Sequence, residues 1–156
     1  MAGAIEGRLA ELGIEVPEAA APVANYVGWV KSGNLVFVSG QVTLKDGQFL
    51  YIGKLGGGMS LEEGQAAARL CGVNIIAQLK AACDGDLDRV KRIVRLGGFV
   101  NSTPDFTDQP KVINGCSDLM VEVFGDKGRH ARAAVSAGSL PLGVAVEVDA
   151  IAEIED

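Results

Sequence analysis

The chain has 156 residues, 48% of them hydrophobic and 22% charged, which is the composition of one globular domain and argues against a disordered or fibrous chain. Its 14 Lys and Arg residues are outnumbered by 20 Asp and Glu residues, so the net charge is −6; a nucleic acid or an anionic membrane would meet net repulsion. Glycine is unusually frequent, with 21 residues, and predicts many tight turns and close backbone approaches.

No targeting or membrane segment is expected. Charged side chains interrupt residues 1–20, so they do not form a signal peptide, and no apolar run approaches the roughly 18 residues of a membrane span. Cys71, Cys83 and Cys116 share no CxxC spacing and fall on apolar helix faces. We therefore expect a cytoplasmic protein with reduced, buried thiols.

The N-terminal part predicts a helical extension, over about residues 1–22, followed by short strands. Ile5, Leu9 and Leu12 share one face of a helical segment that Gly13 ends. Runs of β-type residues follow in three short stretches, of which the first two form a hairpin. These stretches are residues 26–30, 35–38 and 49–52.

A long helix is predicted to start at Ser60, because Ser60 and Glu63 have the spacing of a capping box, and to end at residues 84–85. A strand at residues 93–100 contains Gly97 and Gly98, which indicate a bulge or the close approach of another backbone.

A second helix begins around Asp108, has Pro110 in its first turn, and ends at Gly125. Two strands complete the chain, at residues 131–136 and 144–151. This order of elements predicts a single α+β domain, in which two long helices cover one face of one sheet. The other sheet face is apolar, and we expect it to be buried against further copies of the chain.

The last two strands suggest where chemistry occurs. If they form a hairpin that pivots at residues 139–140, Arg132 lies directly across from Glu147. Glu147 and Asp149 share one face of the last strand, while valines take the other. The pair is either a salt bridge on a solvated face or a functional site. In a site, Arg132 would bind a substrate carboxylate and Glu147 would activate a water molecule.

Several motifs, in this order, resemble the RidA family, also called the YjgF/YER057c/UK114 family. They cover most of the chain and comprise NLVFVSGQ at 34–41, DLDRV at 86–90, PDF at 104–106, VIN at 112–114, AR at 131–132, LP at 140–141 and VEVDA at 146–150. The N-terminal helical extension and residues 114–125 are similar to the longer branch of that family.

The resemblance implies a chorismate-mutase-like fold that forms homotrimers, with ligand pockets in the clefts between subunits. The best-known members are 2-iminobutanoate/2-iminopropanoate deaminases, which hydrolyse enamines and imines to 2-oxo acids and ammonia without a metal or a cofactor. The substrate is a small carboxylate, and neither a nucleic acid nor a membrane is implied as a partner.

The resemblance also assigns roles to residues. Arg132 matches the carboxylate-binding arginine and Glu147 the glutamate that positions water. The remaining matches line the pocket, namely Tyr26, Ser39, Gly40, Asn114 and Ala134.

Some positions depart from the family pattern. Ala134 stands where many members have cysteine, and would act through its backbone N–H. The residues flanking Tyr26 also differ. His130, the only histidine, stands where proline is common; it is either a titratable group near the cleft or a structural ring.

The sequence allows two other functions to be compared with imine hydrolysis. A non-catalytic protein would use the same cleft to bind a 2-oxo acid or another small metabolite. Endoribonuclease activity, an older name for the family, is disfavoured by the net charge of −6 and by the lack of a general-base histidine in basic surroundings. A metal site is not expected, because zinc needs ligands that this chain does not supply.

Overall fold

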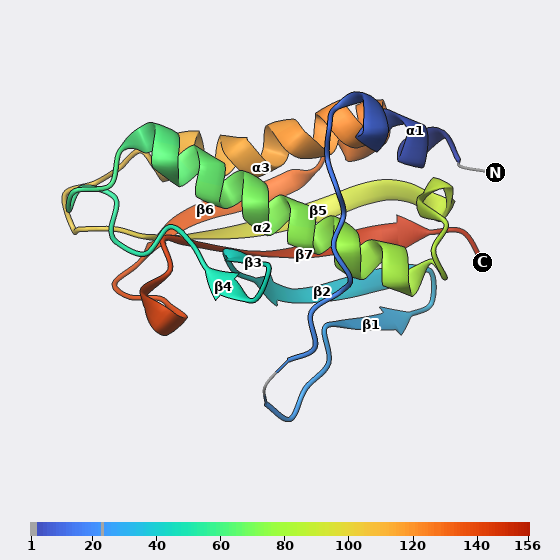
Figure 1. The fold of residues 1–156 in the computed structure, drawn as a ribbon, viewed down its shortest axis with the longest axis horizontal. Helices are drawn as coiled ribbons and strands as arrows, with labels where there is room; N and C mark the ends of the chain where they lie inside the picture. Colours follow the sequence, from blue (N-terminus) through green and yellow to red (C-terminus); the bar gives the residue numbers. More distant parts are fainter. Residues whose placement is uncertain (1–2, 23) are drawn as a thin grey trace.

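The computed structural model describes residues 3–22 and 24–156. Figure 1 shows one layer of helices on one sheet, with a small hairpin at the side. The helices are α1 (Ala4–Glu11), α2 (Leu61–Ala82) and α3 (Gln109–Phe124), and short 3-10 helices occupy Leu87–Arg89, Gly125–Gly128 and Pro141–Gly143. The strands are β1 (Trp29–Ser32), β2 (Leu35–Gln41), β3 (Leu44–Lys45), β4 (Gln48–Phe49), β5 (Val90–Asn101), β6 (Ala131–Ala137) and β7 (Val146–Ile154).

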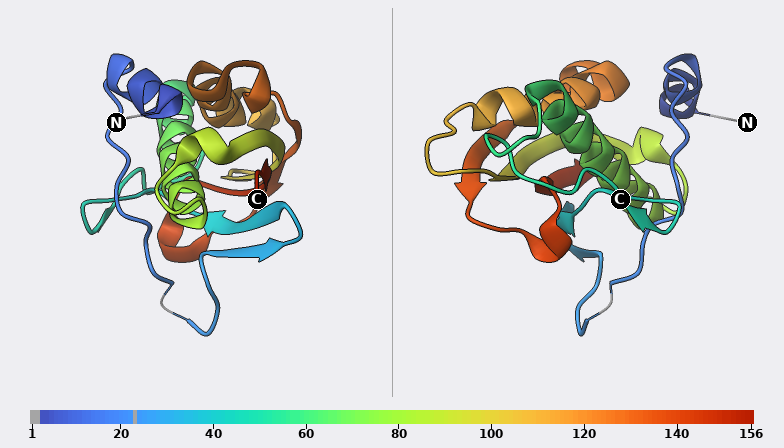
Figure 2. Two further views of the ribbon diagram at one scale, coloured as in Figure 1. Left: turned by 90° about the vertical axis from the view of Figure 1, so that its right-hand side faces the viewer. Right: turned by 60° about the vertical axis from the view of Figure 1, so that its left-hand side comes forward.

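The main sheet has five strands in the order β1-β2-β7-β5-β6. β6 is parallel to β5, and the other neighbouring strands are antiparallel. The long helices α2 and α3 pack against each other and cover one face of this sheet (Figure 2). The structure thus confirms the predicted α+β architecture, with one mixed sheet and two long helices on one face.

Local signals explain where the long helices start and how they pack. Both hydrogen bonds of the predicted capping box are present, since Ser60 Oγ accepts from the Glu63 N–H and Glu63 Oε1 accepts from the Ser60 N–H. On β5, a side chain at Gly98 would overlap Ile113 of α3. A side chain at Gly97 would overlap the Asp149 carboxylate of β7. The glycine pair therefore makes room for two side chains and not for another backbone. The predicted bulge at these glycines is also wrong, because the register shifts of β5 lie before residue 96.

The predicted hairpin between the last two strands is wrong. β5 lies between β6 and β7, so that Arg132 pairs with Leu96 and Glu147 pairs with Phe99. The cause is β5, a long strand that pairs with a neighbour on each side: α3 returns the chain to make β6 parallel to it. Residues 138–145 then arch over the end of β5, where the Asn101 N–H donates to the carbonyl of Ala145.

The predicted third strand also differs. Residues 48–49 pair with residues 44–45 in a separate two-stranded sheet. Tyr51 has a positive φ of 53°, which interrupts an extended strand. Beyond it, Ile52 makes only an isolated bridge to Val144. The first strand starts at Trp29, three residues later than expected.

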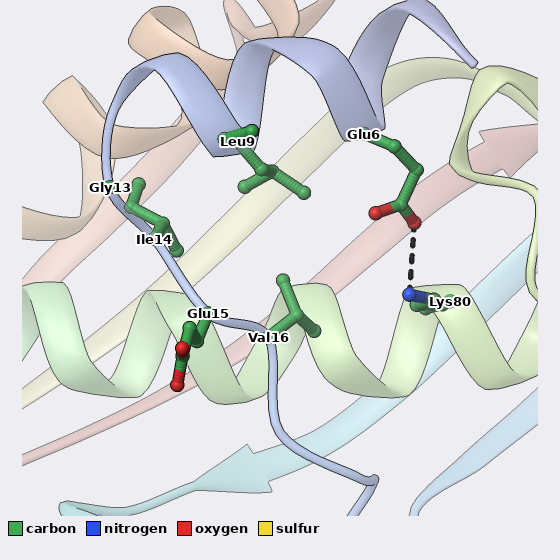
Figure 3. A pocket seen from close by; sticks show the side chains of 8 residues that line it. Glu6, Leu9, Gly13, Ile14, Glu15, Val16 and Lys80 are labelled. Atoms are coloured by element: carbon green, nitrogen blue, oxygen red, sulfur yellow. Dashed lines mark ion pairs between the residues drawn. The ribbon is translucent and has the colours of Figure 1, made fainter. Parts of the chain in front are cut away.

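The N-terminal segment is docked on the helix layer. Leu9 is buried in the core, and Asp88 accepts hydrogen bonds from the backbone N–H groups of Ala4 and Ile5 at 3.0 and 2.9 Å. These bonds cap the start of α1 and lower the pKa of the Asp88 carboxyl. Figure 3 shows the pocket of about 610 Å³ between α1, the segment after it and α2, with the Glu6–Lys80 ion pair at 3.0 Å.

The described residues include no helix that is both long and apolar enough to cross a membrane. All three cysteines are buried and unpaired, as predicted.

Candidate active site

The residues assigned to a site fall into two groups, one at the edge strand β6 and the other around β2 and the central strand β7. Arg132 and Ala134 lie on the edge strand β6, and Asn114 lies on α3 beside it. The second group lies around β2 and β7, and comprises Tyr26, Ser39, Gly40 and Glu147.

In the first group, hydrogen bonds to α3 hold the guanidinium of Arg132. Nη1 donates to Asn114 Oδ1 at 2.8 Å and to Ser117 Oγ at 3.0 Å, and Nη2 donates to the carbonyl of Pro110 at 3.1 Å. All three acceptors lie on α3, so the side chain of Arg132 leaves the sheet on the face that the helices cover. The helix therefore fixes the plane of the guanidinium.

The sequence of α3 explains why these acceptors converge. Pro110, Asn114 and Ser117 are four and three residues apart, so they occupy one face of the helix. The apolar residues of α3 occupy its other side and are buried in the core; they are Val112, Ile113, Cys116, Leu119, Met120, Val123 and Phe124.

His130 extends this group. Its Nε2 lies 2.8 Å from Ser117 Oγ, and its Nδ1 lies 2.6 Å from the carbonyl oxygen of Gly128. Burial lowers the pKa of His130, and the positive charge of Arg132 adds to this effect. We call Arg132, Asn114, Ser117, His130 and the Pro110 carbonyl the arginine cluster.

The thiol nearest this cluster is not a nucleophile. Burial raises the pKa of Cys116 to about 12, although the Arg132 charge opposes the shift. Burial also raises the pKa of Cys71 well above its usual range. Because the thiolate is the reactive form, neither side chain is activated at neutral pH.

The second group lines a cavity of about 430 Å³, which we call the glutamate cavity. Its lining includes Tyr26, Ser39, Gly40, Phe49, Leu142 and Glu147. Glu147 alternates along β7 with buried Val146 and Val148, so its side chain leaves the sheet on the face away from the helices. Burial, and then the neighbouring Asp149 charge, raise the pKa of the Glu147 carboxyl.

Gly40 provides space for Glu147. A Cβ atom at Gly40 would overlap the Glu147 carboxylate, so the absence of a side chain lets the two strands accept this carboxylate between them. The Glu147 carboxylate thus occupies the space that a side chain at Gly40 would take.

Ser39 and Tyr26 form the wall of the cavity beside β2. Ser39 Oγ donates to the carbonyl of Val27 at 2.6 Å, and the Ser39 N–H donates to the carbonyl of Gly28. Ser39 thereby holds the segment that carries Tyr26, whose surface is 55% exposed at the cavity. The hydroxyl proton of Ser39 is already used by this contact.

The structure does not bring Arg132 and Glu147 together within one chain. β5 lies between β6 and β7, so these two strands are about 10 Å apart. Along β5, the partners of Arg132 and Glu147 are three residues apart, which adds an offset of about 10 Å. The two side chains also leave opposite faces of the sheet. Neither belongs to a metal site, because the described residues contain no group of three or more His, Cys, Asp and Glu side chains that could hold an ion.

The comparison with family models identifies the chain. The model described as "YjgF/chorismate mutase-like, putative endoribonuclease" matches residues 6–154. The chain belongs to this family, the YjgF or RidA family. The family match includes most of α1 and the connecting segment as well as the sheet.

Close relatives support the assignment. The protein TCP17 of Trypanosoma cruzi is 51% identical over 155 residues, which are 99% of this chain and 96% of that protein. A crystal structure of a protein of unknown function from Agrobacterium tumefaciens has a TM-score of 0.91 and 50% identity, and covers 97% of this chain and 92% of its own. A second structure, from Shewanella oneidensis and named "a putative endoribonuclease", has a TM-score of 0.93 and 41% identity, and covers 97% of this chain and 100% of its own.

Sequence reasoning missed Ser117 and the apolar wall of the glutamate cavity. Ser117 could have been found, because it follows Asn114 by three residues on the polar side of a predicted helix. Phe49 and Leu142 come from loops far apart in the chain, and no local pattern connects them.

Proposed function

We propose that this protein hydrolyses a small enamine or imine that carries a carboxylate, such as 2-aminoacrylate or 2-iminobutanoate, to a 2-oxo acid and ammonia. The observation that carries the proposal is the guanidinium of Arg132, which α3 holds in one orientation while leaving part of it unused.

The unused part suits a carboxylate. A guanidinium has five N–H groups; both on Nη1 and one on Nη2 donate to α3. Among the described residues, no acceptor is bonded to the N–H of Nε or to the second N–H of Nη2. These two groups lie on neighbouring nitrogens, which is the geometry that binds the two oxygens of a carboxylate.

Glu147 supplies the base. In the proposed reaction the oxygen of a water molecule attacks the imine carbon, and Glu147 accepts a proton from the water and passes it to the imine nitrogen, which gives a neutral carbinolamine. Glu147 then accepts the hydroxyl proton of the carbinolamine and delivers it to the nitrogen as the C–N bond breaks, which releases the 2-oxo acid and ammonia. A raised pKa makes the Glu147 carboxylate a stronger base than an exposed glutamate.

The other pocket residues have supporting roles. Asn114 holds Arg132, and Gly40 makes room for Glu147. Ser39 and Tyr26 bound the cavity in which the substrate side chain would lie. Ala134, two residues after Arg132 on the edge strand, would offer its backbone N–H to the substrate.

The complete site would form between subunits. Arg132 lies on the edge strand β6, whereas the glutamate cavity lies toward the β1 edge. A contact that joins two different patches of the same chain is heterologous, and repetition of such a contact gives a ring when the rotation between neighbours closes and a filament when it does not. In a homotrimer, the arginine cluster of each subunit would meet the glutamate cavity of the next, giving three equivalent sites.

The open face of the sheet supports such an assembly. Val30, Phe37 and Val135 are 52%, 42% and 48% exposed. Val30, Phe37 and Ile151 pair across β1, β2 and β7, so they form a continuous apolar row on the sheet. Contact with neighbouring subunits would remove this row from water.

Imine hydrolysis can be tested with a coupled reaction. A threonine or serine dehydratase would generate the imine, semicarbazide would trap it, and release of the 2-oxo acid would be measured. We expect the wild type to accelerate release and Arg132→Ala to lose the effect. Arg69→Ala is a matched control, because Arg69 is an arginine of α2 that pairs with Glu122 away from both groups.

No acceleration by the wild type, or equal acceleration by Arg132→Ala, would contradict the proposal. A wild type that binds a 2-oxo acid without acceleration would instead be the non-catalytic binding protein.

RNA cleavage is the weaker alternative. The only histidine already contacts Gly128 and Ser117 through its two ring nitrogens, and the net charge is −6. RNA cleavage that survives repurification and disappears in Arg132→Ala would support it.

A further inference from the structure

A chain of hydrogen bonds reaches Arg132 from the region before β6. It runs from the carbonyl of Gly128 to Nδ1 of His130, from Nε2 of His130 to the hydroxyl of Ser117, and from Ser117 Oγ to Nη1 of Arg132, over distances of 2.6, 2.8 and 3.0 Å. None of the assigned roles of the family site accounts for Ser117 or His130.

The direction of each bond in this chain is determined by its ends. A carbonyl oxygen only accepts, so Nδ1 of His130 must carry a proton. A neutral ring then has no proton on Nε2, which accepts the hydroxyl proton of Ser117. At the other end Arg132 only donates, and its Nη1–H meets a lone pair of the Ser117 oxygen. Each group in the chain has the proton or the lone pair that its neighbour needs.

The direction of the hydrogen bond from Ser117 to His130 determines what the Ser117 oxygen offers to Arg132. Ser117 can donate only one proton, and His130 accepts it, so a lone pair of the Ser117 oxygen is always available to the guanidinium. Together with Asn114 this fixes both N–H groups of Nη1. A long arginine side chain loses much freedom on binding a ligand, and prior ordering reduces that loss.

We propose that Ser117 and His130 are positioning residues, which orient the guanidinium of Arg132 so that its Nε and Nη2 N–H groups face a substrate carboxylate. The inference rests on the proposed function in one respect, the role of Arg132 in binding a carboxylate. It does not require that the carboxylate be hydrolysed.

The state of His130 can be observed directly, because it is the only histidine in the chain. Nitrogen-15 NMR of the side chain should report a neutral ring with the proton on Nδ1 at pH 7. In Ser117→Ala, the resonance of Nε2 should shift toward that of a nitrogen without a hydrogen bond. A ring with its proton on Nε2 would overturn the proposal.

The positioning role can be measured as affinity for 2-oxobutanoate, the product of 2-iminobutanoate hydrolysis. Ser117→Ala should weaken binding about tenfold, the effect of one lost hydrogen bond, and in the imine reaction it should raise KM while kcat changes by less than about twofold. Ser117→Thr keeps the hydroxyl and should restore binding. Equal affinity of wild type and Ser117→Ala would overturn the proposal.

Two variants of His130 and one control separate positioning from folding. His130→Gln keeps an acceptor within reach of Ser117 and should bind more tightly than His130→Leu, which has none. Ser102→Ala is the control: the buried hydroxyl of Ser102 is hydrogen-bonded to Ser136 and not to Arg132. Its removal should leave the affinity for 2-oxobutanoate unchanged. If His130→Gln and His130→Leu bind equally, or if Ser102→Ala weakens binding as much as Ser117→Ala, the proposal is wrong.

These outcomes are distinct from failure of the proposed function. If the wild type binds 2-oxobutanoate but does not hydrolyse the imine, the proposed deaminase activity is wrong. The positioning role is still supported in that case if Ser117→Ala binds 2-oxobutanoate more weakly than the wild type. A wild type that binds neither 2-oxobutanoate nor the imine would overturn both.

Discussion

The arginine cluster and the glutamate cavity differ in how far one chain completes them. In the arginine cluster, Arg132 donates hydrogen bonds to three acceptors of α3. Ser117 is hydrogen-bonded to His130, and His130 to the carbonyl of Gly128. The glutamate cavity is open, with Tyr26 55% and Leu142 67% exposed on its wall. The group that would bind substrate is thus ordered within the subunit, whereas the group that would do chemistry lies in a cavity that a neighbour can close.

This difference has a physical reason. An arginine is charged at any physiological pH and can be ordered by neutral oxygens without losing its charge. A glutamate becomes a stronger base when it is removed from water, and closure by a second subunit would complete that removal. Variants of the glutamate cavity and of the arginine cluster, and then mixtures of the two, test this difference.

The largest effect is expected at Glu147. Glu147→Gln keeps the size of the side chain but removes the base, so kcat should fall by about 10²–10⁴ while KM changes little. In the wild type, activity should be present above the raised pKa of Glu147 and lost as pH falls through it, so the acid limb of kcat/KM should lie above the usual glutamate value of 4.5.

The acid limb should be absent from the residual activity of Glu147→Gln. Retention of wild-type kcat by this variant would show that the glutamate cavity does not hold the base.

A smaller effect is expected for Arg132→Lys, which keeps the charge and loses the planar pair of N–H groups. Affinity for the carboxylate should fall about a hundredfold, and KM should rise in proportion. Measurement of 2-oxobutanoate binding by calorimetry would check this. Affinity within about twofold of the wild type would mean that charge alone is recognised and that anchoring by α3 is unimportant.

Combining the two halves should restore activity. If Arg132→Ala and Glu147→Gln subunits are mixed, unfolded and refolded together, some contacts will join an intact arginine cluster to an intact glutamate cavity. For random assembly in a ring, about a quarter of the sites would pair an intact arginine cluster with an intact glutamate cavity, so the mixture should reach about a quarter of wild-type activity, well above either variant alone. No gain, in assemblies that native mass spectrometry shows to be mixed trimers, would contradict a site shared between subunits.

The smallest effect is expected at the docked N-terminal helix. Asp88→Ala removes the acceptor for the first N–H groups of α1 and should lower stability by about 1 kcal/mol or less, or about 2–4 °C in Tm. The stabilisation should be present above the usual aspartate pKa of 3.8 and lost as pH falls through the lowered pKa of the folded state.

Asp118→Ala is the control for this variant, since Asp118 is exposed on α3. Calorimetry of both variants would measure the difference, and activity should not change. An equal Tm for Asp88→Ala and Asp118→Ala would mean that the cap contributes nothing.

The sequence by itself determined the elements that depend on neighbours along the chain. The capping box at Ser60, the apolar face of α3 and the alternation of β7 are local patterns, and each is present in the structure. The family motifs likewise identified the fold, because each motif is a short stretch of residues that are neighbours along the chain. The residues named for the site also lie in the two groups around Arg132 and Glu147.

Only the tertiary structure decided how those groups are arranged. A strand carries no local signal for which strand will lie beside it, so the sequence predicted a hairpin that pairs Arg132 with Glu147. The insertion of β5 between them depends on its pairing along both edges and on the return of α3 across the sheet. That arrangement places the two side chains on opposite faces, and it is the physical reason why a shared site would require a second subunit.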